Sequence, residues 1–199
     1  RRCWRWSERA VPRKESMNLS VLDIFKVGVG PSSSHTMGPM NAACAFVHDL
    51  GAKSLLARVD KVAAQVYGSL ALTGMGHCTD RAILLGLEGN QPSTIDPAAM
   101  GPTLERIRAT GRIRLAGSLE VAFDEPLDLL FHRNQTLPQH PNGMRFEAFD
   151  AQGAQLLTKD FYSVGGGFVI TGDVAAAGGA DTVMIAADKY QRFFPMLMT

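Results

Sequence analysis

Cysteine is scarce in this chain, and its spacing excludes several kinds of site. There are three cysteines, Cys3, Cys44 and Cys78, and no Cys-x-x-Cys pair. An odd number of widely separated cysteines argues against a disulfide framework and against a zinc site. The spacing also differs from that of cysteines that bind an iron–sulfur cluster. We therefore expect no metal site in this chain, a reducing cytoplasmic location, and apolar packing for Cys44 and Cys78.

An excess of charge of either sign is missing, as is a long apolar run. The formal net charge is +1, from 20 Lys and Arg against 19 Asp and Glu, and the one basic cluster lies within residues 1–14. A nucleic-acid partner needs a clustered basic face, and a transmembrane helix needs about 20 consecutive apolar residues. We expect neither a nucleic-acid partner nor a membrane partner.

The remaining composition is that of a soluble globular domain. The 199 residues are 46% hydrophobic and 20% charged, which is enough to bury a core. Residues 1–16 lack the apolar segment of a secretory signal, and a patterned segment follows Met17. We interpret residues 1–16 as an N-terminal extension, with Met17 as the natural start. Residues 17–170 are expected to form one domain, and residues 171–199 a divergent tail or linker.

Helices are expected in the first half of the chain. The segment 17–27 predicts a short helix or strand, whereas the Gly-rich segments 28–39 and 70–80 predict loops. Gly51 is expected to end the first helix. Asp96 is expected to cap a later one, which Gly101–Pro102 interrupts. The expected helices are residues 40–50, residues 81–89 behind a cap at Thr79 or Asp80, and a helix from Pro97 that includes residues 104–110.

Strands dominate the second half. Residues 144–150 and 154–164 flank a short turn, so they predict a hairpin. The other expected strands are residues 58–69, 112–117, 118–123, 128–133 and 165–170. Helices early and antiparallel strands late favour an α+β fold with mixed helices and an antiparallel sheet, rather than a βαβ repeat.

A hydroxyl-rich segment between glycines is the strongest functional signal. Residues 28–39 contain three consecutive serines followed by His35 and Thr36. Hydroxyls and backbone N–H groups ahead of a helix can hold a carboxylate or a phosphate. A histidine beside the bound anion can act as a base. The alternative is a helix-capping loop with extra serines.

Four other segments are polar or glycine-rich, and each has an ordinary structural explanation. Residues 68–77 and 163–168 carry glycines suited to tight bends, and residues 140–144 contain an Asn–Gly turn dipeptide. Residues 132–134 are polar after an apolar strand, which is typical of a solvated edge. None of these segments identifies a function by itself.

The joint order of the segments resembles one family. The runs VLDIFKVGVGPSSSHTMGPM, VYGSLALTGMGHCTDRAILLGLEGNQP, LPQHPNGMRFEAFD and YSVGGGF follow one another along the chain. They resemble the β domain of bacterial iron–sulfur L-serine dehydratases over roughly residues 17–170. The first run is the most specific of the four.

The resemblance implies a lyase that converts L-serine to pyruvate and ammonia, in cytoplasmic amino-acid degradation and gluconeogenesis. It also implies a [4Fe-4S] cluster with one iron acting as a Lewis acid on the serine hydroxyl. In this family the cluster cysteines lie in a following α domain, which is absent from the 199 residues. The chain is thus expected to be a substrate-binding part that is inactive without the α domain, and to form a homo-oligomer.

The resemblance assigns roles to individual residues as well. His35 is the implied base for the α-proton, because a neutral imidazole near pH 7 suits that role. The serine run and Thr36 would hold the substrate carboxylate, with the bend Gly165–Gly167 closing the pocket. The positions implied for substrate binding are Ser32, Ser33, Ser34, Thr36, His77, Asn142 and Gly143. Met75 departs from the family, whose members often carry lysine there.

Two other functions are compatible with the same residues. A regulatory module, of the kind that resembles this domain in some phosphoglycerate dehydrogenases, would bind serine or an anion without catalysis, so His35 would have no proton to transfer. A Ser–His hydrolase would use a serine of the run as its nucleophile. Triad members rarely come from neighbouring positions, and no G-x-S-x-G elbow is present, so the hydrolase is disfavoured.

Overall fold

The computed structural model describes residues 28–172. The predictions for residues 1–16, for 17–27 and for most of 171–199 lie outside the described residues. A five-stranded sheet has the order β4-β1-β5-β6-β7, and β2 and β3 form a separate antiparallel pair. The strands are β1 (Lys61–Tyr67), β2 (Arg112–Leu115), β3 (Leu119–Ala122), β4 (Leu129–His132), β5 (Gly143–Phe149), β6 (Gln155–Gly165) and β7 (Phe168–Thr171).

The helices belong mostly to the first half of the described chain. They are the π-helical turn η2 (Ser33–Met37), α1 (Gly38–Ala52), the 3-10 turns η3 (Leu56–Arg58) and η4 (Gly74–His77), α2 (Gly68–Thr73), α3 (Thr79–Leu87), α4 (Pro97–Thr110) and α5 (Glu125–Asp128). The α+β class predicted from the sequence is therefore confirmed.

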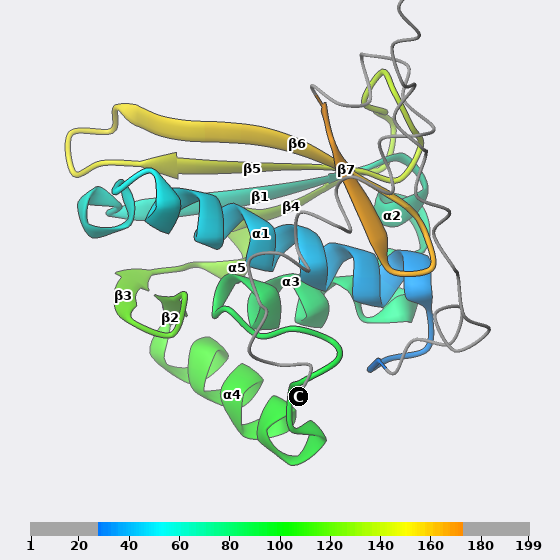
Figure 1. Ribbon diagram of the computed structural model, residues 1–199, viewed down its shortest axis with the longest axis horizontal. Helices are drawn as coiled ribbons and strands as arrows, with labels where there is room; N and C mark the ends of the chain where they lie inside the picture. Colours follow the sequence, from blue (N-terminus) through cyan, green and yellow to red (C-terminus); the bar gives the residue numbers. More distant parts are fainter. Residues whose placement is uncertain (1–27, 173–199) are drawn as a thin grey trace, which may run out of the picture.

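The described elements form layers. Figure 1 shows the large sheet lying along α1, with α3 on the other side of α1 and α4 farthest from the sheet. Strand β7 crosses the end of the sheet beside the beginning of α1. Short α2 and η4 follow β1 at this same end, so the segment that precedes α1 meets the turns that follow β1.

Aromatic side chains join α1 to the sheet. Phe46 of α1 stacks on Phe146 of β5 with 5.5 Å between ring centroids, and Phe146 meets Phe161 of β6 edge-on at 5.7 Å. All three are buried, and pairs in these geometries add to the free energy gained from burying their surface. This contact fixes α1, and with it the turn η2, against the sheet.

The hairpin, the strand β1 and the strand pair β2–β3 agree with the sequence predictions. Strand β4 runs parallel to β1, with Tyr67 beside His132. A parallel neighbour requires a long crossover between the two strands, and here the segment from α2 to α5 supplies it. The large sheet is therefore mixed rather than wholly antiparallel.

Several predicted boundaries are wrong. The predicted loop 70–80 is helical almost throughout, and the first helix begins within the predicted loop 28–39 and continues through Gly51. Helix α4 is not interrupted at Gly101–Pro102, although Asp96 caps it as predicted by accepting from the Ala98 N–H. Glycine was taken as a loop signal, but a glycine within a helix costs only about 1 kcal/mol relative to alanine, which tertiary packing readily offsets.

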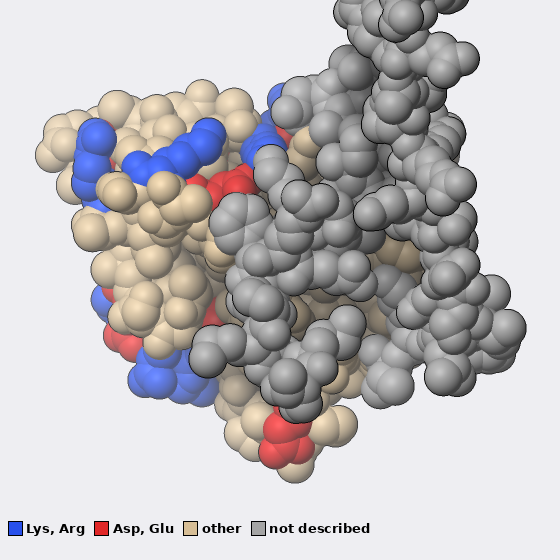
Figure 2. All heavy atoms as spheres, viewed as in Figure 1, with Lys and Arg blue, Asp and Glu red and all other residues tan. Residues whose placement is uncertain are grey.

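Figure 2 shows small groups of basic and acidic side chains among mostly uncharged residues, on the part of this face that belongs to the described residues. Within the residues that the structure describes, no helix is long and apolar enough to cross a bilayer.

Candidate active site around two imidazoles

The serine run forms a single turn of π-helix that leads directly into α1. Ser32 precedes the turn in an extended conformation, and its hydroxyl accepts a hydrogen bond from the His35 N–H at 3.2 Å. Serine is favoured at such a cap because its side chain satisfies an N–H group without a partner inside the helix. Single π-turns occur frequently at functional sites. The turn holds the His35 side chain at the end of the sheet.

Both ring nitrogens of His35 have hydroxyl partners. Nδ1 lies 2.9 Å from the Ser34 hydroxyl oxygen, and Nε2 lies 3.2 Å from that of Ser69 in α2. Burial lowers the pKa of His35, and the nearby His77 lowers it further because two positive imidazoles repel. His35 is thus held in its neutral form near pH 7, the form that can accept a proton.

His77 is the second imidazole of the site. Its ring centroid lies 5.1 Å from that of His35, at a tilt of 43°. Its Nδ1 lies 2.9 Å from the carbonyl oxygen of Thr73. A carbonyl oxygen only accepts hydrogen bonds, so Nδ1 must carry the proton, and Nε2 of the neutral ring has a lone pair available. Sequence reasoning placed His77 in the pocket lining, and the structure brings it beside His35.

Thr36 and Ser33 differ in what their hydroxyls face. Thr36 is 3% exposed, and its hydroxyl donates to the His77 carbonyl oxygen at 2.7 Å. Ser33 is exposed. The Ser33 hydroxyl is therefore open to a small ligand from solvent, whereas the Thr36 hydroxyl joins two segments of the protein.

Asn142 reaches the serine run through one intermediary, Ser163 of β6. The Asn142 side-chain amide donates to the Ser163 carbonyl oxygen at 3.1 Å, and the Ser163 hydroxyl donates to the Ser34 carbonyl oxygen at 2.8 Å. A Cβ on Gly38 would lie 2.1 Å from the Ser163 hydroxyl oxygen, so this crossing requires glycine. Gly143 contributes backbone only, at the start of β5, and packs on Leu137.

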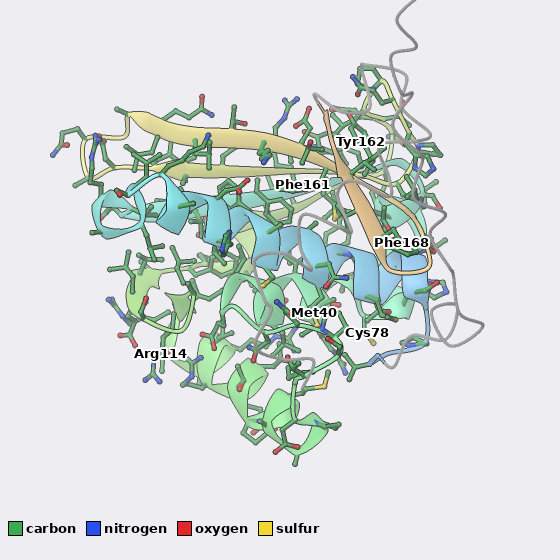
Figure 3. The ribbon with its side chains drawn as sticks, in the orientation of Figure 1. Met40, Cys78, Arg114, Phe161, Tyr162 and Phe168 are labelled. Atoms are coloured by element: carbon green, nitrogen blue, oxygen red, sulfur yellow. The ribbon has the colours of Figure 1, made fainter. Side chains whose placement is uncertain are left out.

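The glycine bend Gly165–Gly167 folds onto the beginning of α1. The Asn41 side-chain amide donates to the Gly167 carbonyl oxygen at 2.9 Å. Figure 3 places Phe168, which follows the bend, beside the N-terminal end of α1. The bend therefore lies next to the π-turn, as the sequence prediction requires of a segment that closes the site.

Sequence reasoning missed four side chains that organise the site: Asn41, Ser69, Thr79 and Ser163. Ser69 had a usable signal, because it follows Gly68 at the end of a strand. Gly68 has φ +56°, a left-handed conformation that favours glycine and turns β1 abruptly into α2. The other three carry no local signal, since their partners are distant in sequence.

The described cysteines do not fit an iron–sulfur cluster, which takes thiolate ligands. Burial raises the pKa of the Cys44 thiol to about 11, and its sulfur contacts the Gly89 carbonyl oxygen inside the fold. Cys78 is partly buried beside α3 (Figure 3). Within residues 28–172, no three His, Cys, Asp or Glu side chains are grouped closely enough to hold a metal ion.

A cleft of about 610 Å³ lies elsewhere, between the end of α4, the end of β3 and the start of β1. Its cations are paired: Lys61 lies 2.9 Å from Asp128, and Arg108 lies 2.7 Å from Glu125 and 3.1 Å from the buried Asp80. None of the residues that line the cleft belongs to the imidazole site. We refer to it as the charged cleft.

Comparison with known proteins gives a consistent result. The sequence profile described as serine dehydratase beta chain matches residues 20–174. The chain is 49% identical over 169 residues to an L-serine dehydratase of Streptomyces coelicolor, covering 85% of this chain and 36% of that protein. It is 47% identical over 153 residues to L-serine dehydratase 1 of Escherichia coli, covering 76% and 33%. The chain thus spans about a third of the length of the relatives it matches.

Proposed function

Because the chain belongs to the serine dehydratase beta chain family, we propose that it is the substrate-binding part of an L-serine dehydratase. The observation that carries the proposal is the pair of imidazoles His35 and His77, with ring centroids 5.1 Å apart, beside the hydroxyls of the serine run. An elimination from serine needs a proton acceptor at Cα and donors that hold the carboxylate, and these groups supply both kinds.

The hydroxyls of Ser32, Ser33 and Ser34 are proposed to hold the substrate carboxylate. Holding that group strongly stabilises the negative charge that develops when the weakly acidic α-proton leaves. Ser33 is the most open of the three, so it would make the first contact. Ser32 and Ser34 already stabilise the turn, and they would add their remaining hydrogen-bonding capacity.

One of the two imidazoles is proposed to accept the α-proton. His35 is the base that the family resemblance implies, and its lowered pKa supports a neutral ring. The geometry also favours His77, because its Nε2 lone pair is available while both nitrogens of His35 contact serine hydroxyls.

The [4Fe-4S] cluster implied by the resemblance has no ligand set among residues 28–172. We propose that a separate α domain holds it and that this domain is the partner of the chain. The contribution of the residues described above is then to bind and orient L-serine and to handle the proton at Cα.

The test is reconstitution with the part of a relative that this chain does not span. The chain would be mixed with the part of the Streptomyces coelicolor L-serine dehydratase that lies outside the aligned segment, and the cluster would be rebuilt without oxygen. Pyruvate formation from L-serine is expected. The variants His35→Asn and His77→Asn should each be measured. Replacing the residue that acts as the base should lower kcat of the complex at least about 100-fold. An assembled, cluster-loaded complex without activity would refute the proposal.

The regulatory alternative makes a different prediction for the same variants. If the chain only binds serine or an anion, calorimetry should show binding that His35→Asn leaves intact, and no pyruvate should form. Substrate binding with full loss of turnover in His35→Asn or His77→Asn would exclude that alternative.

A further inference from the structure

Two buried threonine hydroxyls connect the imidazole segments in opposite directions. Thr36 follows His35 and donates to the carbonyl oxygen of His77, whereas Thr79 lies two residues after His77 and donates to the carbonyl oxygen of His35. The two threonines are 3% and 0% exposed. Each histidine backbone is therefore held by a side chain from the segment that carries the other histidine.

Each threonine side chain packs against a nearby glycine, Thr36 against Gly30 and Thr79 against Gly74. A Cβ on Gly30 would lie 2.3 Å from Cγ2 of Thr36, and a Cβ on Gly74 would lie 2.9 Å from the Thr79 hydroxyl oxygen. Both threonine side chains therefore pack closely against a glycine that has no room for a larger side chain. The two hydrogen bonds are thus fixed by packing as well as by burial.

We propose that Thr36 and Thr79 form a reciprocal clamp that fixes the spacing and tilt of the His35 and His77 rings. The inference takes the proposed function of the imidazole site as given and adds two positioning residues to it. Neither threonine hydroxyl needs to touch the substrate. Each acts by holding the backbone from which one imidazole projects, which assigns Thr36 a task other than carboxylate binding.

The clamp has an electrostatic consequence because the two rings are close. Burial and the charge of His77 both lower the pKa of His35, so rings that separate and admit water should let that pKa rise. Several other ionisable groups on the elements packed against the π-turn have partners of their own, among them Asp160, which pairs with Arg145, while Arg81 of α3 is exposed. Asp49 pairs with Lys159, Asp80 pairs with Arg108, and Cys44 contacts Gly89. The spacing of the two imidazoles is therefore what sets the coupling.

The test follows the five histidines of the full chain by NMR titration, without substrate or partner. Thr79→Val and Thr36→Val keep the shape of the side chain and remove the hydroxyl. Each should raise the pKa of His35 by roughly 0.5 unit, the size expected for like charges about 5 Å apart in a well-solvated site. Thr79→Ser and Thr36→Ser keep the hydroxyl and should stay near the parent value.

A matched control is Thr110→Val. The Thr110 hydroxyl also donates to a carbonyl oxygen, that of Arg106, but on the exposed part of α4. Removing it should leave the pKa of His35 unchanged. The decisive comparison is made in a chain that also carries His77→Asn, because the clamp acts through the distance between the His35 and His77 rings. In that background Thr79→Val should change the pKa of His35 by far less than it does in the parent chain.

Three results would overturn the clamp. They are an unchanged His35 pKa in both valine variants, an equal shift in His48 and His132, and a full shift that persists without the His77 ring. If the valine variants do not fold, His77→Asn in the parent chain still decides, since removing the neighbouring ring should raise the pKa of His35. An unchanged His35 pKa in that variant would refute the clamp. Because no step requires catalysis, failure of the clamp is distinguishable from failure of the proposed function.

Discussion

The imidazole site and the charged cleft are opposites in almost every physical respect. The cleft is a hollow of about 610 Å³ lined by charged side chains. The imidazole site is crowded, and its described functional groups are two imidazole rings, hydroxyls and backbone carbonyls. The cleft has the volume of a small-molecule site, whereas the chemistry of the side chains selects the other region.

The difference lies in whether polar groups are already satisfied by partners of opposite charge. In the cleft, the cations Lys61 and Arg108 are each paired with carboxylates. Acidic side chains outnumber basic ones in its lining, so the cleft offers no unpaired cation to a substrate carboxylate. In the imidazole site, His35 is kept uncharged by burial and by its neighbour. An imidazole must be neutral before it can accept a proton. The imidazole site is therefore better suited to proton transfer than the charged cleft.

The largest expected effect comes from changing one charge-bearing side chain in each region of the reconstituted complex. His77→Asn should lower pyruvate formation at least about 100-fold if His77 is the base, and still reduce it if the ring only assists His35. Asp124→Asn removes a charge from the cleft without breaking an ion pair of the described residues, and should leave the rate within about twofold. Equal losses from both variants would abolish the comparison.

Two glycines of α1 provide the next test. Gly38→Ala would force a Cβ against Ser163 and should destabilise the protein by about 1–3 kcal/mol through overpacking. Gly51→Ala, at the other end of the same helix, meets nothing within 4 Å and should be neutral or stabilising by up to about 1 kcal/mol. Urea unfolding monitored by circular dichroism measures both. A neutral Gly38→Ala would mean that the crossing at Ser163 is loosely packed.

Within the cleft region, burial should separate two arginines. Arg108→Gln leaves the buried Asp80 carboxylate without its partner and should cost about 1–2 kcal/mol, discounted for the partly exposed arginine. Arg112→Gln breaks only an exposed pair with Glu120 and should have no measurable effect on the unfolding free energy. A larger loss for Arg112 would contradict the assignment of the cleft charges to stability.

The smallest expected effect is a pH dependence of folding stability that arises in the imidazole site and not in the charged cleft. The pKa of His35 is lower in the folded chain than its ordinary value of about 6.5. Between these two values the unfolded chain binds more protons, so stability should rise with pH through that window and fall on acidification. His35→Asn should flatten the melting temperature between pH 5 and 7. Asp128 raises the pKa of Lys61, so Lys61 stays protonated throughout that range.

The distance in sequence between interacting residues explains what the sequence could predict. Local patterns predicted the hairpin, β1, the cap at Asp96 and the α+β class, because each depends on residues close together in the chain. The histidines and the serine run were found for the same reason. The helical state of residues 70–80 was missed, because Gly74 is small in order to pack against Thr79 and Phe131 rather than to bend the chain.

Contacts between distant segments could not be predicted. Ser163 lies in a strand and has an ordinary serine environment in sequence, yet its hydroxyl reaches Ser34. The parallel register of β1 and β4 likewise depends on the crossover between them. The roles of Ser32, Ser33, Ser34, Thr36, Asn142 and Gly143 in substrate binding stay predictions, as does the cluster-bearing partner.

The hydrogen bond from Ser163 to Ser34 joins residues 129 positions apart. Closing so long a loop has an entropic cost that must be met before the contact contributes stability, and contacts of this separation slow folding. A nascent or partly folded chain therefore carries every imidazole and hydroxyl named above while lacking the arrangement that makes them useful. Competence to grip a small polar molecule would then report that the entire sheet has assembled, which makes ligand affinity a measure of folding as well as of chemistry.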